Sequence, residues 1–251
     1  MFKRRTIVKP WDGSIEPFKI VENVYFIGTF QASSHLIDTG DGLIVIDTGY
    51  LPSLYLVVNS IYKLGFKPTD IKYILNSHWH LDHTEATAAL AQLSGARTYI
   101  GRKDADKAEA FFTPDALIDD GDIITLGNTS IRCMETPGHT AGTISFFFDS
   151  AGERKYRCGM FGGAGANTLA AGQFDYDGCR EGYLVSLDRL RGERVEVFLG
   201  NHVWNNNTEE KAEILRRTGE NKFIDSDIWG EFLDFCGKRL KEIVEAENNK
   251  A

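Results

Sequence analysis

The sequence predicts an α+β fold in which helices lie outside two packed β-sheets. Short runs rich in β-branched and aromatic residues occur between positions 24 and 49, and strand-like and helix-like segments alternate through the rest of the chain. No low-complexity tract and no long linker separates one part of the chain from another. We therefore expect residues 1–251 to form a single domain.

The first half of the chain is expected to open with an antiparallel meander. Its short β-rich runs are separated by Gly-Asp turn signals, and the apolar residues that follow have helical spacing up to Gly65. The expected elements are strands at 24–27, 35–37 and 43–46, a helix at 51–64, a strand at 71–75 and a helix at 84–93. A histidine cluster lies between the last two elements and therefore occupies a strand-to-helix loop.

The second half continues the alternation of strands and helices. The expected elements are a strand at 97–100, a helix at 103–112, strands at 123–126, 131–134, 143–148 and 156–161, a helix near 184–190, a strand at 195–199 and amphipathic helices at 208–217 and 225–247. The strands at 123–126 and 131–134 begin the second sheet and lead to the segment around His139.

Composition and charge limit the classes of partner that the protein can have. The 36 acidic and 28 basic residues give a net charge of -8, which argues against a nucleic-acid partner because the only basic cluster is Lys3, Arg4 and Arg5. Nothing apolar of signal-peptide length follows that cluster, and no window approaches the roughly 20 apolar residues of a membrane span. We expect a cytoplasmic protein, or a periplasmic or secreted one if a leader was removed, which acts on a small molecule. Its oligomeric state stays open, with a monomer favoured.

The four cysteines predict buried thiols. Cys133, Cys158, Cys179 and Cys236 lie far apart and include no CxxC spacing, which would be typical of a thiolate zinc site or a redox pair. Free cysteine is usually buried, so we expect a packing role for Cys158.

The segment His78-Trp-His80-Leu-Asp82-His83 predicts a metal site. It places four side chains that bind divalent zinc, through imidazole nitrogen or carboxylate oxygen, within six residues. In an extended loop His78 and His80 project to the same side, whereas Asp82 and His83 follow the turn into a helix and can face a second position. One loop can therefore serve two metals, and the alternative of a surface loop with solvated histidines is disfavoured by this spacing.

Each metal needs a further ligand, and three other histidines are available. His139 follows Pro137-Gly138 at the end of an expected strand, and His202 follows another expected strand. Ligands carried by the ends of several strands are typical of a rigid sheet that supports loop-borne chemistry. His35 lies within a strand, so we expect it to be packed or hydrogen-bonded rather than a ligand.

These residues resemble the metallo-β-lactamase superfamily. The resemblance rests on HxHxDH at 78–83, the strand and turn LIVIDTG at 43–49, TPGHT at 136–140 and GNH at 200–202, and it spans roughly residues 18 to 245. It implies an αββα four-layer sandwich with two Zn²⁺ ions at one edge. It also implies one metal held by His78, His80 and His139, a second held by Asp82, His83 and His202, and a role for Asp47 in orienting a ligand histidine.

Two departures bear on the branch of the superfamily. Most hydrolytic branches carry a metal-bridging aspartate after the strand at 156–161, but residues 158–167 contain no acid. The chain is in this respect similar to the third subclass of class B β-lactamases. That subclass usually has serines, which help to hold the substrate carboxylate, where this chain has Gly163 and Gly165. Asn167 is a candidate donor to a substrate oxygen or a turn former, and the later acids Asp175 and Asp177 are not expected to reach the metals.

The resemblance implies a hydrolase in which hydroxide, generated from water between two zinc ions, attacks the carbonyl of a cyclic amide such as a β-lactam. Asp82 is the candidate catalytic residue, as a proton donor to the leaving group. A lactonase or thioesterase of the same fold is the alternative. From other classes, an iron-dependent oxidoreductase and a non-catalytic metal-binding module remain open, although three protein ligands for each metal would leave an open coordination position.

Aromatic residues next to the expected metal loops are candidates for the wall of a substrate pocket. Trp79, Trp204, Phe30 and Tyr50 lie beside those loops or at a strand end, and half of them are equally compatible with plain core packing.

Overall fold

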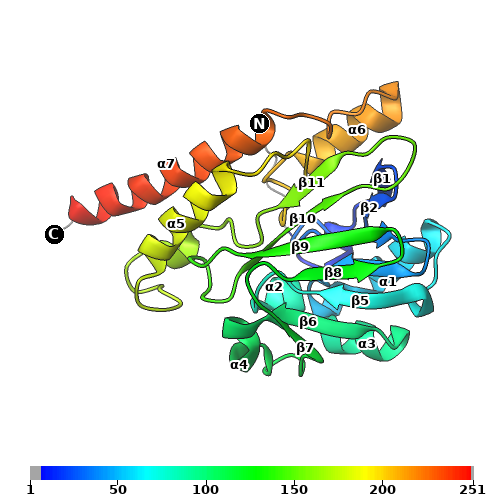
Figure 1. The fold of residues 1–251 in the computed structure, drawn as a ribbon, viewed down its shortest axis with the longest axis horizontal. Helices are drawn as coiled ribbons and strands as arrows, with labels where there is room; N and C mark the ends of the chain where they lie inside the picture. The colour runs from blue at the N-terminus through cyan, green and yellow to red at the C-terminus, as the bar shows by residue number, and fades with distance from the viewer. Residues whose placement is uncertain (1–6, 250–251) are drawn as a thin grey trace.

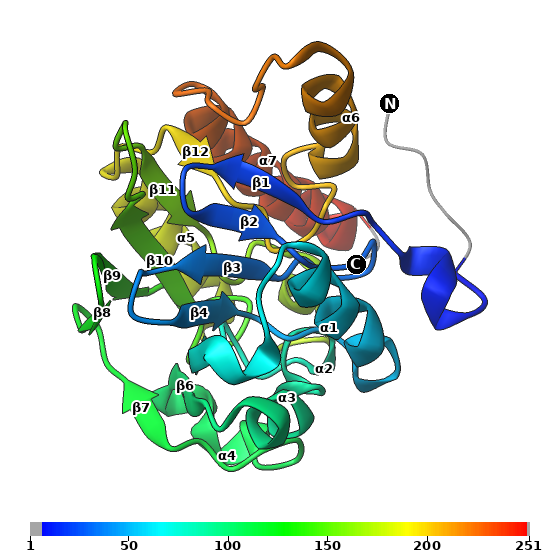
Figure 2. The ribbon, with the colours of Figure 1, turned by 90° about the vertical axis from the view of Figure 1, so that its right-hand side faces the viewer.

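The computed structural model describes residues 7–249, so the basic cluster Lys3, Arg4 and Arg5 lies outside the described residues. Two β-sheets face each other, and helices cover their outer faces (Figures 1 and 2). This arrangement is the αββα sandwich that the sequence predicts, and the α+β fold class is confirmed.

The first sheet has seven strands in the order in which they occur in the chain. They are β1 (Phe18–Val21), β2 (Val24–Phe26), β3 (His35–Asp38), β4 (Leu43–Ile46), β5 (Ile71–Leu75), β6 (Arg97–Gly101) and β7 (Ala116–Ile118). Strands β1 to β4 form the expected antiparallel meander, whereas β4 to β7 run parallel to one another. The parallel part brings the carboxyl ends of β4 and β5 to the same edge of the sheet.

The second sheet has five strands, and its order is β12 (Val197–Phe198), β11 (Arg157–Met160), β10 (Ile144–Asp149), β9 (Thr129–Glu135) and β8 (Ile123–Leu126). Only the β11–β12 pair is parallel. The α-helices are α1 (Leu54–Lys63), α2 (Leu81–Thr84), α3 (Thr87–Ser94), α4 (Ala105–Ala108), α5 (Cys179–Arg191), α6 (Thr208–Thr218) and α7 (Ile228–Asn248).

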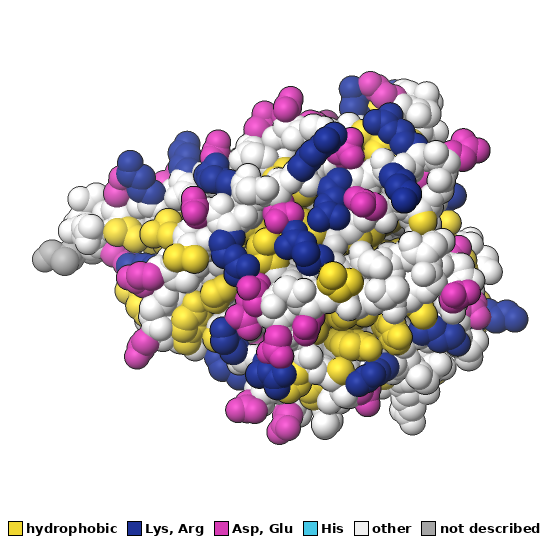
Figure 3. All heavy atoms as spheres, viewed as in Figure 1, with side chains coloured by type: hydrophobic (Ala, Val, Ile, Leu, Met, Phe, Trp, Pro, Cys, Tyr) yellow, Lys and Arg dark blue, Asp and Glu magenta, His cyan; other side chains and the backbone are white. Residues whose placement is uncertain are grey.

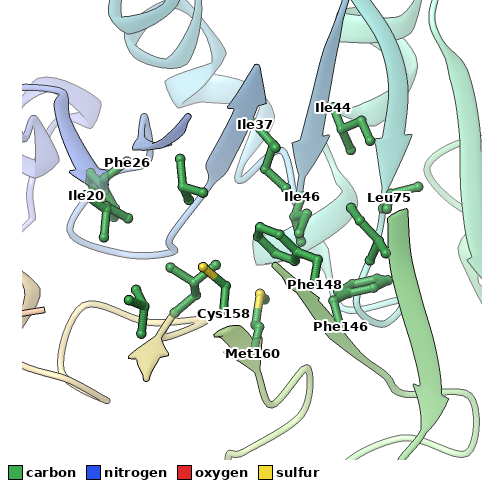
Figure 4. Packing of buried hydrophobic residues seen from close by; sticks show 14 of the residues in the cluster. Ile20, Phe26, Ile37, Ile44, Ile46, Leu75, Phe146, Phe148, Cys158 and Met160 are labelled. Carbon is green, nitrogen blue, oxygen red and sulfur yellow. The ribbon is translucent and has the colours of Figure 1, made fainter. Parts of the chain in front are cut away.

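Alternating side chains of the strands divide the apolar core into layers. The central layer lies between the two sheets and includes Ile37, Ile44 and Ile46 from the first sheet and Phe146 and Phe148 from the second (Figure 4). The neighbouring residues on the same strands point to the opposite faces. Leu36, Leu43 and Val45 pack against Val57 and Ile61 of α1, and Phe147 packs against Tyr183 of α5 and Trp229 of α7. Both sheets are therefore apolar on two faces, and the polar site is confined to one edge.

Most of the expected elements are present, with four corrections. Strands β1 and β7 were not expected, and both are short, with β7 limited to three residues at the edge of its sheet. The helix expected at 103–112 is reduced to α4, which follows the 3-10 turn Arg102–Asp104 and gives way to turns after Ala108. The strand expected at 195–199 is limited to β12, because only Val197 and Phe198 pair with β11.

The surface carries interspersed charges. On the face seen in Figure 3, Lys and Arg side chains alternate with Asp and Glu, and no large area of that face has a single sign. Within residues 7–249 no helix combines the length and the apolar character that crossing a bilayer requires. All four cysteines are buried and unpaired, as expected from their spacing.

Candidate metal centre

The histidine loop follows β5, next to the end of β4. The backbone N–H of Asp47, just beyond β4, donates to the carbonyl of Leu75 at 2.9 Å and holds the two strand ends together. Residues 76–80 then leave the sheet, and α2 begins at Leu81. Asp82 and His83 therefore lie on α2, whereas His78 and His80 precede it, as the spacing of the motif predicts. The rings of His78 and His83 stay in contact, with centroids 4.3 Å apart.

The second sheet supplies the two remaining histidines. His139 lies in the loop between β9 and β10, and His202 lies beyond β12. The six side chains gather into two sets at one edge of the sandwich: His78, His80 and His139, and Asp82, His83 and His202. Within each set the possible ligand atoms all lie within 4.8 Å of one another. The structure thus brings together the side chains that the sequence singled out, in the same two groups.

Hydrogen bonds at Nδ1 fix the ring orientations of His139 and His202. The Nδ1 atom of His139 donates to the carbonyl of Gly165 at 2.6 Å, and the Nδ1 atom of His202 donates to the carbonyl of Gln31 at 2.9 Å. Each ring therefore keeps an unprotonated Nε2. These atoms face the first sheet, because Nε2 of His139 lies 2.9 Å from Nδ1 of His80 and Nε2 of His202 lies 3.7 Å from Asp82.

Asp47 orients two residues of the histidine loop, in line with the role that the family resemblance implies. Its carboxylate is fully buried and accepts from the backbone N–H of Ser77 at 2.7 Å, the hydroxyl of Ser77 at 2.8 Å and Nδ1 of His83 at 2.8 Å. Because the Ser77 hydroxyl proton goes to Asp47, the Ser77 oxygen accepts from Nδ1 of His78 at 3.0 Å. His78 and His83 therefore also present an unprotonated Nε2.

Those two Nε2 atoms provide a test of whether the residues fit a metal. Both are buried and have no hydrogen-bond partner among the described residues, although a buried polar atom without a partner is costly. Neutral imidazole nitrogens and one carboxylate are ligands that zinc accepts, and each set supplies three of them. The donor set therefore fits two divalent cations of the zinc type.

Burial favours the neutral imidazole at His78, His139 and His202, whereas His83 is shifted toward its protonated form. Burial lowers the pKa of His139 to about 3 and that of His202 to about 4, and it holds the pKa of His78 well below its usual value. Burial also acts to lower the pKa of His83, but the carboxylates of Asp82 and Asp47 outweigh it, so the pKa is raised. Burial acts to raise the pKa of Asp82, but its histidine neighbours lower it. Neutral histidines and an ionised aspartate are the protonation states that metal binding requires.

A pocket of about 370 Å³ opens beside the second set. It is lined by Ile7, Phe30, Gln31, Tyr50, Asp82, Asn167, His202 and Trp204. The Trp204 ring stacks on His202 with centroids 4.3 Å apart, and Phe30 contacts Trp204 edge-on at 6.5 Å. Three of the four aromatic residues expected at the pocket are therefore present. Trp79 instead packs against the small cluster of Ile100, Ala108 and Phe112.

The sequence did not predict that the buried carboxylates of Asp104 and Asp175 lie near the site. Asp104 accepts from the backbone N–H of Trp79 at 3.1 Å, from the Thr140 hydroxyl at 2.7 Å and from the Gly142 N–H at 2.7 Å, so it joins the loops of His78 and His139. Burial raises its pKa to about 6. Asp175 accepts from Nε1 of Trp79 at 3.1 Å and from Lys107 at 2.6 Å, and it stands outside both ligand sets, as does the exposed Asp177.

His35 is buried in β3, where it packs edge-on against Phe26. It belongs to neither ligand set, which agrees with the packed role expected for it.

Gly163 and Gly165 lie against the back of His139. A Cβ atom at residue 163 would be 2.8 Å from Cβ of His139, and one at residue 165 would be 3.1 Å from Cε1 of His139 and 2.8 Å from the Asn167 side-chain oxygen. The glycines therefore allow the tight backbone path that one interpretation of the sequence assigns to them, with the carbonyl of Gly165 bound to His139.

Gly165→Ser is expected to displace His139 and to weaken metal binding by about 10- to 100-fold, the usual effect of disturbing a group that orients a ligand. Zinc affinity measured by competition with a chromogenic chelator checks this expectation. Gly172→Ser is the matched control, because a Cβ there meets nothing within 4 Å, although its φ of +79° makes some loss of stability common to both variants. Equal zinc affinity of the two variants would contradict the role assigned to Gly165.

Comparisons with known proteins agree with this geometry. Residues 27–152 match the sequence profile of the metallo-β-lactamase superfamily, and the chain belongs to that superfamily. The fold is similar to that of BJP-1, a subclass B3 metallo-β-lactamase of Bradyrhizobium japonicum, with 27% identity, a TM-score of 0.88 and coverage of 98% of this chain and 99% of that one. It is also similar to the FEZ-1 metallo-β-lactamase from Legionella gormanii, with 25% identity, a TM-score of 0.87 and coverage of 94% and 98%.

Curated relatives match over shorter stretches. A hydroxyacylglutathione hydrolase of Chelativorans sp. is 36% identical over 101 residues, which are 40% of this chain and 37% of the relative. The probable polyketide biosynthesis zinc-dependent hydrolase PksB of Bacillus subtilis is 28% identical over 135 residues, 52% of this chain and 56% of the relative. The chain thus spans about half or less of the length of these relatives.

Proposed function

We propose that the protein is a two-zinc hydrolase that opens a cyclic amide such as a β-lactam. The observation that carries this proposal is the convergence of two three-residue ligand sets at one edge of the sandwich, with the buried Nε2 atoms of His78 and His83 left without hydrogen-bond partners. The likeness over nearly the whole chain to subclass B3 metallo-β-lactamases, and the lack of an acid in residues 158–167, support the choice of reaction.

Zinc bound there would supply Lewis acidity for a carbonyl oxygen and lower the pKa of water toward neutrality. His78, His80 and His139 would hold one ion, and Asp82, His83 and His202 the other. The protein contributes rigidity, because Asp47, the Gly165 carbonyl and the Gln31 carbonyl each hold one nitrogen of a ligand ring. No separate protein base is needed to activate water in such a site.

Asp82 is the residue we assign to proton transfer toward the leaving group. Its carboxylate lies 3.5 Å from Nε2 of His83 and lines the pocket, where it remains one-fifth exposed. It therefore lies where bound substrate and solvent can both reach it, unlike the fully buried Asp47.

Zinc-loaded protein is expected to hydrolyse nitrocefin or a carbapenem, and a chelator should abolish the reaction. Asp82→Asn should lower kcat even in preparations in which elemental analysis shows full zinc content, because an amide cannot pass the proton. Full activity of that variant at full metal content would remove Asp82 from catalysis. Purified protein that holds iron would favour an oxidoreductase instead. Protein that holds zinc but cleaves no β-lactam, lactone, thioester or phosphodiester would favour a non-catalytic metal-binding module.

Thioester hydrolysis is the second candidate, and the relatives favour it specifically, because several of them are hydroxyacylglutathione hydrolases at 35% to 36% identity. The aligned segments cover only 33% to 37% of the length of these relatives, so most of each relative is not aligned with this chain. Including S-lactoylglutathione among the substrates separates the two reactions, since a kcat/KM higher than that for nitrocefin would assign the thioester.

A further inference from the structure

The two loops that supply the first ligand set, His78, His80 and His139, belong to different sheets. His78 and His80 follow β5 of the first sheet, whereas His139 lies between β9 and β10 of the second. The loops meet where Nδ1 of His80 lies 2.9 Å from Nε2 of His139. A metal site divided between two sheets keeps its geometry only if the two loops are held at a fixed separation.

The side chain of Asp104 joins these two loops. One of its carboxylate oxygens accepts from the backbone N–H of Trp79, which lies between the two histidines of the first loop. The same oxygen accepts from the hydroxyl of Thr140, which directly follows His139, and the other oxygen accepts from the N–H of Gly142. Asp104 is fully buried, so water does not compete for these bonds.

The usual role of an aspartate at this position of a helix does not account for these bonds. Asp104 directly precedes α4, where an aspartate side chain commonly caps the first turn, yet it makes no capping hydrogen bond. Gly142 permits the close approach of the other loop, because a Cβ at residue 142 would lie 2.8 Å from Oδ1 of Asp104 and would collide with its backbone nitrogen. The carboxylate of Asp104 therefore serves the ligand loops and not its own helix.

A second carboxylate binds the same two loops. Asp175 accepts from Nε1 of Trp79 at 3.1 Å and from the N–H of Ala141 at 3.2 Å, and Lys107 of α4 binds it at 2.6 Å. The backbone and the indole of Trp79 are thus both joined through a carboxylate to residues 140–142. None of these bonds involves a residue of the second ligand set.

From this arrangement we propose that Asp104 is a positioning residue for the first metal ion alone. The inference rests on the proposed function, because it concerns one zinc ion of the same centre. Loss of the link should weaken binding of that ion by about tenfold, the lower end of the usual effect, because Asp104 bonds to neighbours of the ligands and not to their rings. The second ion should bind as before. A backbone bond from the Ile144 N–H to the Ser77 carbonyl, at 2.8 Å, also joins the two sheets, so we expect the fold to survive.

Two substitutions break the link in different places. Asp104→Asn replaces one acceptor oxygen with an amide group that faces N–H and O–H donors, and Thr140→Val removes only the hydroxyl. Competition with a chromogenic chelator resolves the two zinc-binding steps, and His139→Ala and His202→Gln identify the step that belongs to each set. Both substitutions should weaken the step that His139→Ala removes and leave the other unchanged. Burial raises the pKa of Asp104 to about 6, so measurement above pH 7 keeps its carboxylate ionised.

Thr140→Ser and Thr98→Val are the matched controls. Serine keeps a hydroxyl that can donate to Asp104, so this variant should bind zinc as the unchanged protein does. Thr98 is likewise a buried threonine whose hydroxyl donates to a carboxylate, that of Asp115 at 2.8 Å, but this bond joins β6 to the segment before β7. Thr98→Val should lower the melting temperature and keep both zinc constants, which separates loss of stability from loss of ligand geometry.

Equal weakening of both zinc-binding steps in Asp104→Asn and Thr140→Val would overturn the inference. Equal zinc constants in Thr140→Val and Thr140→Ser would also overturn it, and this comparison decides the matter even if Asp104→Asn does not fold. Protein that binds two zinc ions but hydrolyses no β-lactam or thioester would refute the proposed hydrolase, whereas the zinc constants would still decide the role of Asp104. Protein that binds no zinc would refute both.

Discussion

His139→Ala is expected to lower β-lactam hydrolysis by about three orders of magnitude and to remove about half of the bound zinc. A three-residue site that loses one neutral imidazole no longer holds its ion firmly, and the several kcal/mol of charge stabilisation that a metal supplies correspond to about 10³ in rate. Zinc per chain by elemental analysis and kcat/KM on the same sample measure the two effects. The second ligand set should keep its ion, because Asp82, His83 and His202 do not depend on the His139 loop.

His35→Ala provides the matched control for this substitution. His35, in the first sheet, is likewise a buried imidazole, so its loss creates a comparable cavity, but it belongs to neither ligand set. The control should lower thermal stability and keep both zinc ions. If His139→Ala retained full zinc and full activity, the assignment of the first ligand set would be wrong, whatever the effect on stability.

The sequence predicted which candidate ligands gather at one edge of the sandwich, because four of the six lie close together in the chain. His78, His80, Asp82 and His83 fall within six residues, and the turn from an extended loop into α2 is enough to separate them into two pairs. His139 and His202 were recognisable since each follows an expected strand, and family resemblance allotted them to the two sets. The structure adds what fixes the rings, through the side chains of Asp47 and Ser77 and the carbonyls of Gly165 and Gln31, and backbone carbonyls leave no trace in a sequence.

Other features depend on contacts between distant parts of the chain. Asp104 joins the loops of His78 and His139 from a segment that was expected to be an ordinary helix, and its buried side chain immediately precedes α4. Trp79 sits in the middle of the metal motif, yet its indole packs away from the pocket and donates to Asp175, which is 96 positions further along the chain. Spacing along the sequence cannot place such residues, because their positions are set by tertiary packing.

The metal-free protein is expected to lose stability steeply as the pH falls from 6.5 to 4. Burial lowers the pKa of His35 and His139 to about 3 and that of His202 to about 4, whereas each titrates near 6.5 in the unfolded chain. In that pH window the unfolded chain binds protons that the folded chain does not bind. The stability from each imidazole is therefore present above pH 6.5 and is lost below it, at about 1.4 kcal/mol per pH unit. Urea unfolding of chelator-treated protein at pH 7, 6 and 5 measures the slope.

His83 acts with the opposite sign and in a different window. Burial acts to lower its pKa, but Asp82 and Asp47 raise it above the unfolded value, so its stabilisation is complete below pH 6.5 and is lost as the pH rises through the folded pKa. His83 therefore does not offset the loss of folding stability at acid pH. Replacing His202 with Gln should reduce the acid slope by about one proton, roughly 1.4 kcal/mol per pH unit. A midpoint urea concentration that stays constant between pH 6.5 and 5 would mean that these imidazoles are hydrated in the metal-free protein, and that the tightly packed ligand cluster forms only around its ions.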